Sequence, residues 1–284
     1  MATAMSPNRF RAELRELRLE LHWRQWCALG VAAQVKPESR WVVDLEALAV
    51  STMALGQEDA RLLRLAQEWL ALNREWVSTP RLRRIGHAFG NGLTTSVSGL
   101  LAGARGRAKV AKPVVTQPVL LQLQLRALLG MDVRADVFGY LLFHKDGNSS
   151  SIARAIYVDQ RRVYDVLERW GAAGVVRRVP GGHSLVPDAV PAMAAEAREQ
   201  TEWHNWTATY LTLDRLEKSL ARVPAGDRYM ASSLARDIGA EIEAQAAAVG
   251  VSMASADRYP GTAYFEPFAD GVNAWLRRLL SCRE

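Results

Sequence analysis

The sequence predicts a mainly helical fold that contains one small β-hairpin. Most of the chain consists of stretches in which apolar side chains recur every three or four positions, the spacing of an amphipathic helix. One stretch, VVRRV followed by PGGH and SLVP, has the alternation and the glycine turn of a hairpin. The 284 residues are 49% hydrophobic, so a sizeable core is expected and disorder of the whole chain is not.

Residues 1–90 are predicted to form a helical N-terminal domain. Helices are expected over residues 8–30, over the stretch that ends at Gly56, over residues 57–77 and after Pro80. In the helix over 57–77 the acidic residues Glu58 and Asp59 lie in the first turn, where the helix dipole favours them. Its apolar stripe comprises Leu62, Leu65, Ala66, Trp69 and Leu72. No catalytic motif is found in this range.

Residues 91–117 are predicted to form a basic linker that is rich in glycine and alanine. They lie in a window from Trp76 to Met131 that has no acidic residue and eight cations, a net charge of +8. These cations are Arg81, Arg83, Arg84, Arg105, Arg107, Lys109, Lys112 and Arg126. Arg105, Arg107, Lys109 and Lys112 are candidates for auxiliary, non-specific contacts with DNA phosphates.

Residues 118–190 are predicted to form a domain of short helices that ends in the hairpin. One helix opens at Pro118 and ends at Gly130, and another covers residues 133–143. Asn148 or Ser149 can cap a short helix over SSIARAI, and Asp159 can cap the next helix, which starts at Gln160. The apolar stripe of that last helix comprises Val163, Val166, Leu167 and Trp170.

Residues 191–284 are predicted to form a C-terminal helical region for dimerisation or for binding a partner or ligand. A long helix is expected over residues 195–221, and others over 228–250 and 269–281. The first of these carries Trp203, Trp206 and Tyr210. We interpret this aromatic series as a dimer interface in preference to a ligand pocket.

The segment from Asp132 to Pro187 resembles the DNA-binding domain of bacterial winged helix-turn-helix regulators of the ArsR/MarR type. The resemblance covers about a fifth of the chain. It rests on SSSIARAI with the small Ala153 at a helix contact, on DQRRVYDVLERWGAAGVV and on RRVPGGHS. The resemblance implies sequence-specific binding of double-stranded DNA by a transcriptional repressor that acts as a homodimer.

The resemblance also implies roles for individual residues. The helix that starts at Gln160 corresponds to the recognition helix, so Arg161 and Arg162 can donate to guanine and Gln160 can bind adenine. Tyr164 can contact a phosphate or a thymine methyl group, and Asp165 can hold Arg161 or accept from cytosine. The residues expected at phosphates or in the adjacent minor groove are Ser149, Ser150, Ser151, Arg177, Arg178 and His183.

Charge and motif content restrict the other function classes. The net charge of +6 favours an anionic partner. The chain has no apolar run long enough to cross a membrane and no signal peptide, so a cytoplasmic location without membrane contact is expected. Cys27 and Cys282 form no metal motif, and the histidines fit no enzyme motif. We therefore expect no metal, no cofactor and no catalytic residue.

Three alternatives stay open at this point. The chain could be an antitoxin or a regulatory subunit that binds another protein of a toxin or defence system. It could be a sensor gated by a small-molecule effector, or a nucleic-acid enzyme whose carboxylates follow no motif.

Overall fold

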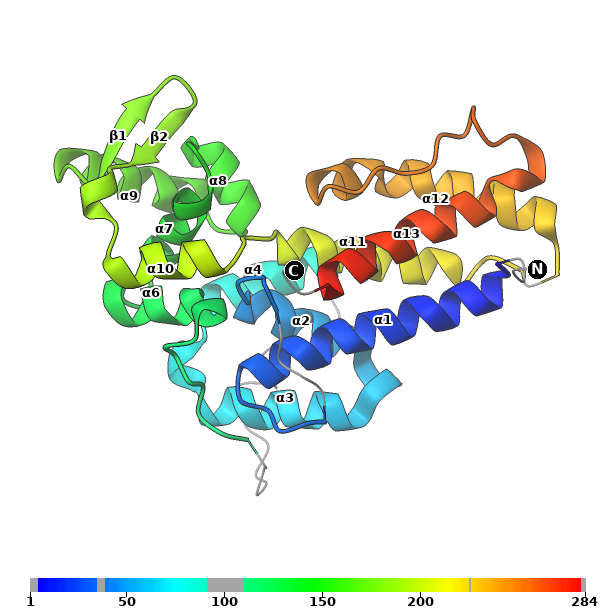
Figure 1. Cartoon of the computed structure of the whole chain (residues 1–284), viewed down its shortest axis with the longest axis horizontal. Coiled ribbons are helices and arrows are strands. Elements are labelled where there is room, and N and C mark those ends of the chain that lie inside the picture. Colours follow the sequence, from blue (N-terminus) through cyan, green and yellow to red (C-terminus); the bar gives the residue numbers. More distant parts are fainter. Residues whose placement is uncertain (1–4, 35–38, 91–109, 225, 282–284) are drawn as a thin grey trace. The chain divides into compact units, whose positions relative to one another are not determined.

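The computed structural model of the chain describes residues 5–34, 39–90, 110–224 and 226–281. These residues form helices and one two-stranded antiparallel sheet, so the prediction of a mainly helical fold is confirmed (Figure 1). The chain divides into two compact units, one of Met1–Trp23 with Ala208–Glu284 and one of Arg24–Thr207. The domain ranges 1–90, 91–117, 118–190 and 191–284 stay predictions.

The unit of Arg24–Thr207 contains the end of α1 (Pro7–Ala28) and most of the short helices. Its other elements are α2 (Leu45–Leu55), α3 (Ala60–Leu72), α4 (Thr79–Phe89), α6 (Leu121–Leu129), α7 (Val133–Phe143), α8 (Ser149–Ile156), α9 (Gln160–Ala172), β1 (Val176–Val179), β2 (Gly182–Leu185) and α10 (Ala192–Gln200). Helix ends follow the sequence signals, since Asp44 Oδ1 accepts from the Ala47 N–H at 3.1 Å and Gly56 ends α2 with φ 57°.

Helix α7 is packed on two sides. Val137 and Leu141 belong to a core cluster shared with α8 and α9, whereas Phe138 and Leu142 belong to a cluster shared with α6 and α10. Trp170 of α9 lies edge-on to Phe138, with ring centroids 6.0 Å apart. Val137, Leu141 and Leu142 therefore all face inward, and α7 joins the two clusters into one support for α9.

The helix predicted over residues 57–77 is shorter in the structure, because α3 covers Ala60–Leu72. Trp69 is fully buried and its Nε1 donates to the Leu29 carbonyl oxygen at 2.7 Å. The predicted stripe holds for its first four members, but Leu72 is 51% exposed. Leu72 is the last residue of the helix, so it lies beyond the part of α3 that packs on the end of α1.

The long helix predicted over residues 195–221 is wrong. Helix α10 ends at Gln200, and α11 (Trp206–Leu220) begins after an extended segment. In that segment the Glu202 N–H donates to the Arg40 carbonyl at 2.7 Å, and the Glu202 carbonyl accepts from the Val42 N–H at 2.9 Å. Thr, Trp, His and Asn are weak helix formers, so pairing with the chain near residue 41 prevails over local helical periodicity.

Two of the three aromatic residues interpreted as a dimer interface are buried within the chain, and Trp203 is partly exposed. Trp206 is 1% exposed and Tyr210 is fully buried. Trp206 Nε1 donates to the Val42 carbonyl oxygen at 2.8 Å. The dimer-interface interpretation of Trp206 and Tyr210 is therefore wrong, because aromatic residues at helical spacing serve as the chain's own core.

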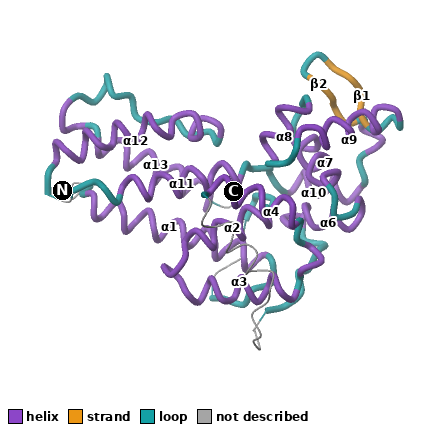
Figure 2. The backbone as a smooth tube through the Cα atoms, turned by 180° about the vertical axis from the view of Figure 1, so that it is seen from behind, coloured by secondary structure: helices purple, strands orange, loops and turns teal. Residues whose placement is uncertain are grey.

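The unit of Met1–Trp23 with Ala208–Glu284 contains most of α1 and α11, together with α12 (Arg228–Ala248) and α13 (Phe265–Leu280). Helices α12 and α13 run side by side (Figures 1 and 2). Phe10 of α1 lies edge-on to Phe265 and Phe268 of α13, at 5.9 and 6.0 Å between ring centroids. The helices predicted over residues 8–30, 228–250 and 269–281 are confirmed, although α13 begins earlier than the expected residue 269.

His22 is a neutral, fully buried side chain within this unit. Its Nδ1 donates to the Arg18 carbonyl oxygen at 2.7 Å, and its ring lies 4.7 Å from that of Tyr210. Burial, followed by the charge of Arg18, lowers the pKa of His22 from 6.5 to about 3. Arg18 is itself paired with Glu217.

Acidification is expected to destabilise the protein through His22. Below pH 6.5 the unfolded chain binds a proton at this residue, but the folded protein binds it only near pH 3. His22 should therefore contribute about 2 kcal/mol to the loss of unfolding free energy between pH 7.5 and pH 5. Urea unfolding at the two pH values measures this loss. The loss should shrink by that amount in His22→Gln and persist in His87→Gln, whose side chain is exposed. An unchanged loss in His22→Gln would contradict the assignment.

Candidate nucleic-acid interface

Helix α9 exposes its first turns and buries its opposite face. Asp159 caps it as predicted, because Asp159 Oδ1 accepts from the Arg161 N–H at 2.9 Å and from the Arg162 N–H at 3.4 Å. Val163 and Leu167 lie in the core cluster with α7 and α8, at 0% and 1% exposure. The predicted stripe is confirmed, and it fixes which side chains of α9 face outward.

The outward side chains at the start of α9 are those of Gln160, Arg161, Arg162 and Tyr164, all of which are exposed. Arg161 Nε lies 3.2 Å from Asp165 Oδ1, which confirms the predicted contact across one helical turn. The guanidinium of Arg161 also lies 5.5 Å from the Tyr164 ring centroid. The Arg161 side chain is 77% exposed, so these contacts orient it and leave donors available.

Arg162 differs from Arg161 because it pairs with an acid of another helix. Its Nη2 forms an ion pair with Asp132, the residue that caps α7. The Arg162 side chain is 51% exposed, and such a pair contributes about 1 kcal/mol or less. The pair uses one nitrogen of the Arg162 guanidinium, and Asp132 reduces the positive charge that this side chain offers to a nucleic acid.

The N-terminus of α8 is already capped from within the chain. Asn148 Oδ1 accepts from the Ser150 N–H at 3.1 Å and from the Ser151 N–H at 2.9 Å, while the Asn148 N–H donates to Ser151 Oγ at 3.1 Å. A phosphate at this end would meet the hydroxyl groups of Ser149 and Ser150. The backbone N–H groups of Ser150 and Ser151 are occupied.

The hairpin of β1 and β2 lies next to α9 in Figure 1, and its strand β1 carries Arg177 and Arg178, which are both exposed and point to opposite faces of the hairpin. Arg178 Nη2 is 2.8 Å from Glu168 Oε1 of α9, and its side chain is 77% exposed. Arg177 is also exposed. The hairpin therefore presents two cations, one of which is shared with a carboxylate of α9.

His183 lies within β2, not at the hairpin tip where the sequence places it, because Val179 pairs directly with Gly182. Its N–H donates to the Gly147 carbonyl at 2.8 Å, and its carbonyl accepts from the Gly147 N–H at 3.0 Å. Burial and then the charge of Arg178 lower the pKa of His183. His183 is therefore neutral at pH 7 and ties the hairpin to the turn before α8.

Replacing Gly182 by alanine is expected to displace the hairpin. Gly182 has φ +135°, and a Cβ there would overlap the Gly147 carbonyl and the Asn148 nitrogen. The free energy of unfolding should fall by about 1–3 kcal/mol. Thermal unfolding measures it, with Gly171→Ala as the matched control. An added Cβ at Gly171 meets no atom within 4 Å and should leave stability equal or slightly higher. Equal stability of both variants would contradict this.

Helix α4 contributes cations that were not among the predicted site residues. Arg83, Arg84 and His87 are exposed, and Arg84 Nη1 lies 3.9 Å from Asp159 Oδ2. Together with Tyr157, Asp159 and Arg162, these side chains line a cavity of about 300 Å³. The available signal was the acid-free window of residues 76–131, which predicted positive charge without indicating where the chain places it.

Two cations of that window are not available to a ligand. Arg81 and Arg126 are 4% and 2% exposed. Arg81 is bound to Asp44 and Glu46, and Arg126 to Glu46 and Asp136. Two of the eight positive charges in residues 76–131 are therefore neutralised by neighbouring carboxylates and are not available to a nucleic acid.

The auxiliary contacts proposed for the basic linker fall mostly outside the described residues. Arg105, Arg107 and Lys109 lie there, and Lys112 is described and exposed. Lys112 follows Ala111, whose N–H donates to the Gly30 carbonyl at 3.2 Å. These auxiliary contacts stay predictions.

The chain matches no protein-family model, no curated protein and no solved structure. The roles considered for its residues therefore depend on the geometry of this chain. Within residues 5–34, 39–90, 110–224 and 226–281, no group of His, Cys, Asp or Glu side chains is placed to hold a metal ion. Over the same ranges, no helix combines the length and the apolarity that crossing a membrane requires.

Proposed function

We propose that this protein is a sequence-specific regulator of transcription that binds double-stranded DNA. The observation that supports the proposal is that α9 exposes polar side chains on one face and is buried on the other. Its first turns expose Gln160, Arg161, Arg162 and Tyr164, and its other face is fixed in the core by Val163 and Leu167. A recognition helix needs this combination, because its N-terminal side chains must contact bases while its position stays constant.

The order of α7, α8, α9 and the hairpin is that of a winged helix-turn-helix, which supports the resemblance to ArsR/MarR-type regulators. In this arrangement Arg161, oriented by Asp165, donates to guanine O6 and N7, and Gln160 binds adenine. Arg177 and Arg178 of the hairpin contact the backbone or the adjacent minor groove. Arg83 and Arg84 of α4 add phosphate contacts beside the start of α9.

The protein is proposed to act as a homodimer whose two copies of α9 enter successive major grooves, and to repress by occluding a promoter. A dimer with twofold symmetry matches half-sites about 34–36 Å apart. Sedimentation of the protein with and without duplex DNA tests this stoichiometry. Binding of one protomer per duplex would contradict the proposed homodimer.

The test of the proposed function is fluorescence anisotropy on duplex DNA from upstream of the protein's own gene, against a scrambled duplex, across a salt series. The upstream duplex should bind at least about 10³-fold more tightly than the scrambled one. Both affinities should fall with salt, because phosphate contacts release counterions. Equal and weak binding of the two duplexes would overturn the proposal.

The second candidate is a winged-helix regulatory partner, such as an antitoxin, that binds another protein. Two ion pairs favour it, because Arg162 and Arg178 are paired with Asp132 and Glu168 in this chain. Such pairs lower the charge offered to a polyanion and suit a surface of mixed sign. Copurification of one unrelated chain in fixed stoichiometry, together with loss of the DNA preference above, would support it.

A further inference from the structure

The cavity of about 300 Å³ beside α4 lies within the unit of Arg24–Thr207. Its lining residues come from α4, from the turn that joins α8 to α9, and from the first turns of α7 and α9. The volume is at the lower end of the range for small-molecule sites, about 300–1,000 Å³. The cavity therefore has room for a small ligand.

One face of α4 forms a basic wall of this cavity. The α4 residues on that face are Pro80, Arg83, Arg84 and His87. They follow the i, i+3, i+4, i+7 spacing, which places side chains on one side of a helix. All four are exposed, so the two arginines and the histidine reach the cavity without being part of the core.

The arginines around the cavity have N–H donors that the chain does not use. Within the part of the chain that the structure describes, the Arg83 guanidinium forms no ion pair or hydrogen bond. Arg84 Nη1 is 3.9 Å from Asp159 Oδ2, which is beyond hydrogen-bond distance. Arg162 pairs with Asp132 through Nη2. A guanidinium group has five N–H donors, so donors remain available for an anion.

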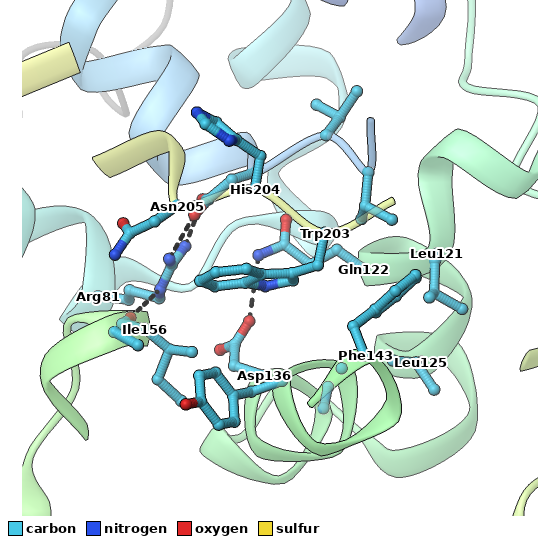
Figure 3. A pocket seen from close by; sticks show the side chains of 17 residues that line it. Arg81, Leu121, Gln122, Leu125, Asp136, Phe143, Ile156, Trp203, His204 and Asn205 are labelled. Atoms are coloured by element: carbon cyan, nitrogen blue, oxygen red, sulfur yellow. Dashed lines mark hydrogen bonds and ion pairs between the residues drawn. The ribbon is translucent and has the colours of Figure 1, made fainter. Parts of the chain in front are cut away.

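The inner wall of the cavity is a set of buried side chains that are bonded to one another. Arg81 is paired with Asp44, and its Nε donates to the Ile156 carbonyl at 2.8 Å. Asp136 Oδ1 accepts from Gln122 Nε2 at 3.1 Å. Figure 3 shows Arg81 and Asp136 with these bonds, in a smaller pocket of about 50 Å³ that they also line. These bonds hold α4 against the end of α8, so the wall is in place before a ligand binds.

Tyr157 contributes an aromatic ring to the cavity from the turn between α8 and α9. It ends α8 in the left-handed conformation with φ 54°, and no other non-glycine residue of the described ranges has a positive φ. Glycine or asparagine is usual at such a position, because a Cβ is strained there. Strain of this kind is typical of functional sites, including those that hold ligands. With Val133 and Val158, the ring gives the cavity a partly apolar side.

From the basic wall and the Tyr157 ring we infer that the cavity binds a small organic phosphate. Arg83 and Arg84 would donate to the phosphate oxygens, and the organic part would pack against Tyr157. Arginine binds phosphate through two parallel N–H bonds, and these charge-assisted bonds are stronger than neutral ones. A phosphate group offers three acceptor oxygens and nearly two negative charges, so it suits two arginines better than a carboxylate does. A dephosphorylated ligand of the same shape would gain only the packing.

Occupancy of the cavity is also expected to weaken DNA binding, a consequence that rests on the proposed function. Asp159 and Arg162 at the start of α9 line the cavity. The proposed function assigns Arg83 and Arg84 to phosphates of DNA. A bound organic phosphate would take the same donors and place negative charge beside α9. The free ligand would thus act as an effector that competes with the duplex.

Calorimetric titration of the DNA-free protein at constant ionic strength tests the cavity. The probes are phenyl phosphate, a hexose phosphate and a nucleoside monophosphate, each with its dephosphorylated form, and inorganic phosphate. At least one ester should bind about ten-fold or more tightly than its dephosphorylated form and than inorganic phosphate. Equal binding of every ester and inorganic phosphate, or no binding by any ester, would overturn the inference.

Variants locate the binding of that ester. Arg83→Gln/Arg84→Gln should weaken it at least about ten-fold. Tyr157→Asn keeps a residue that tolerates the left-handed conformation, so it should weaken the ester and leave inorganic phosphate unchanged. Arg154→Gln is the matched control, because Arg154 is exposed on α8 and does not line the cavity. Unchanged ester binding in the first two variants, or an equal loss in Arg154→Gln, would overturn the inference.

The DNA experiment is read separately. A saturating concentration of the ester should lower the affinity for a preferred duplex at constant ionic strength. If the ester binds and leaves that affinity unchanged, the cavity is supported and the competition is overturned. If no ester binds while Arg83→Gln/Arg84→Gln weakens the duplex, the two arginines serve DNA alone and the inference is overturned. If the protein prefers no duplex, the proposed function fails while calorimetry still decides the cavity.

Discussion

Replacing Glu46 by glutamine is expected to destabilise the protein by about 3–5 kcal/mol, the usual cost of removing one partner from a buried ion pair. Both carboxylate oxygens of Glu46 are used. Oε1 accepts from Arg126 and from the Ser78 N–H at 2.8 Å, and Oε2 accepts from Arg126 and Arg81. A glutamine amide must direct its NH₂ group at one of these sets of donors, which leaves buried N–H groups without an acceptor.

Urea or thermal unfolding at pH 7 measures this effect. Glu75→Gln is the matched control, because Glu75 is exposed and its replacement should change the free energy of unfolding by less than about 0.5 kcal/mol. If Glu46→Gln were as stable as that control, the ion pairs of Glu46 with Arg81 and Arg126 would not hold α2, α4 and α6 together.

The pH dependence of Glu46 has a fixed sign. Its pKa is about 2 in the folded protein, against 4.5 for the unperturbed group, so the unfolded chain binds the proton first as the pH falls. The stability that Glu46 contributes is complete above about pH 4.5 and is lost as the pH falls toward 2. Glu46→Gln should lack this part of the acid dependence.

Local sequence signals predicted much of the fold. The caps at Asp159 and Gly56 and the stripe of Val163, Val166 and Leu167 all lie where the sequence placed them. These signals depend on residues within one or two turns of each other, so the neighbouring sequence determines them. The same holds for the hairpin, whose Pro-Gly-Gly turn needs only local geometry.

Features that depend on distant segments were not predictable in this way. Arg126 and Glu46 are 80 residues apart, and composition could not distinguish these buried cations from exposed ones. The same limit explains the wrong helix around Trp203, whose backbone is set by pairing of Glu202 with Arg40 and Val42. At the candidate interface, the pairing of Arg162 with Asp132 and the addition of α4 also come from tertiary structure.

The double variant Arg161→Ala/Arg162→Ala is expected to lose the preference for the upstream duplex. Each good bidentate contact with a base contributes about 1–3 kcal/mol of discrimination, so the loss of two contacts, about 2–6 kcal/mol, should lower affinity for that duplex by roughly 30-fold to 10⁴-fold. Affinity for the scrambled duplex should fall much less, because contacts with phosphates elsewhere remain. Stability should change little, since both side chains are more than half exposed, at 77% and 51%.

Two matched variants separate base recognition from general charge. Arg169→Ala removes an exposed cation from the last turn of the same helix and should leave the preference intact. Arg177→Ala removes a cation of the hairpin, so it should weaken binding to both duplexes alike and lower the salt slope by about one. Because Arg161 and Arg177 are both exposed, only their positions distinguish them. If Arg177→Ala abolished the preference and the double variant did not, the hairpin would contact the bases and α9 would serve to position it.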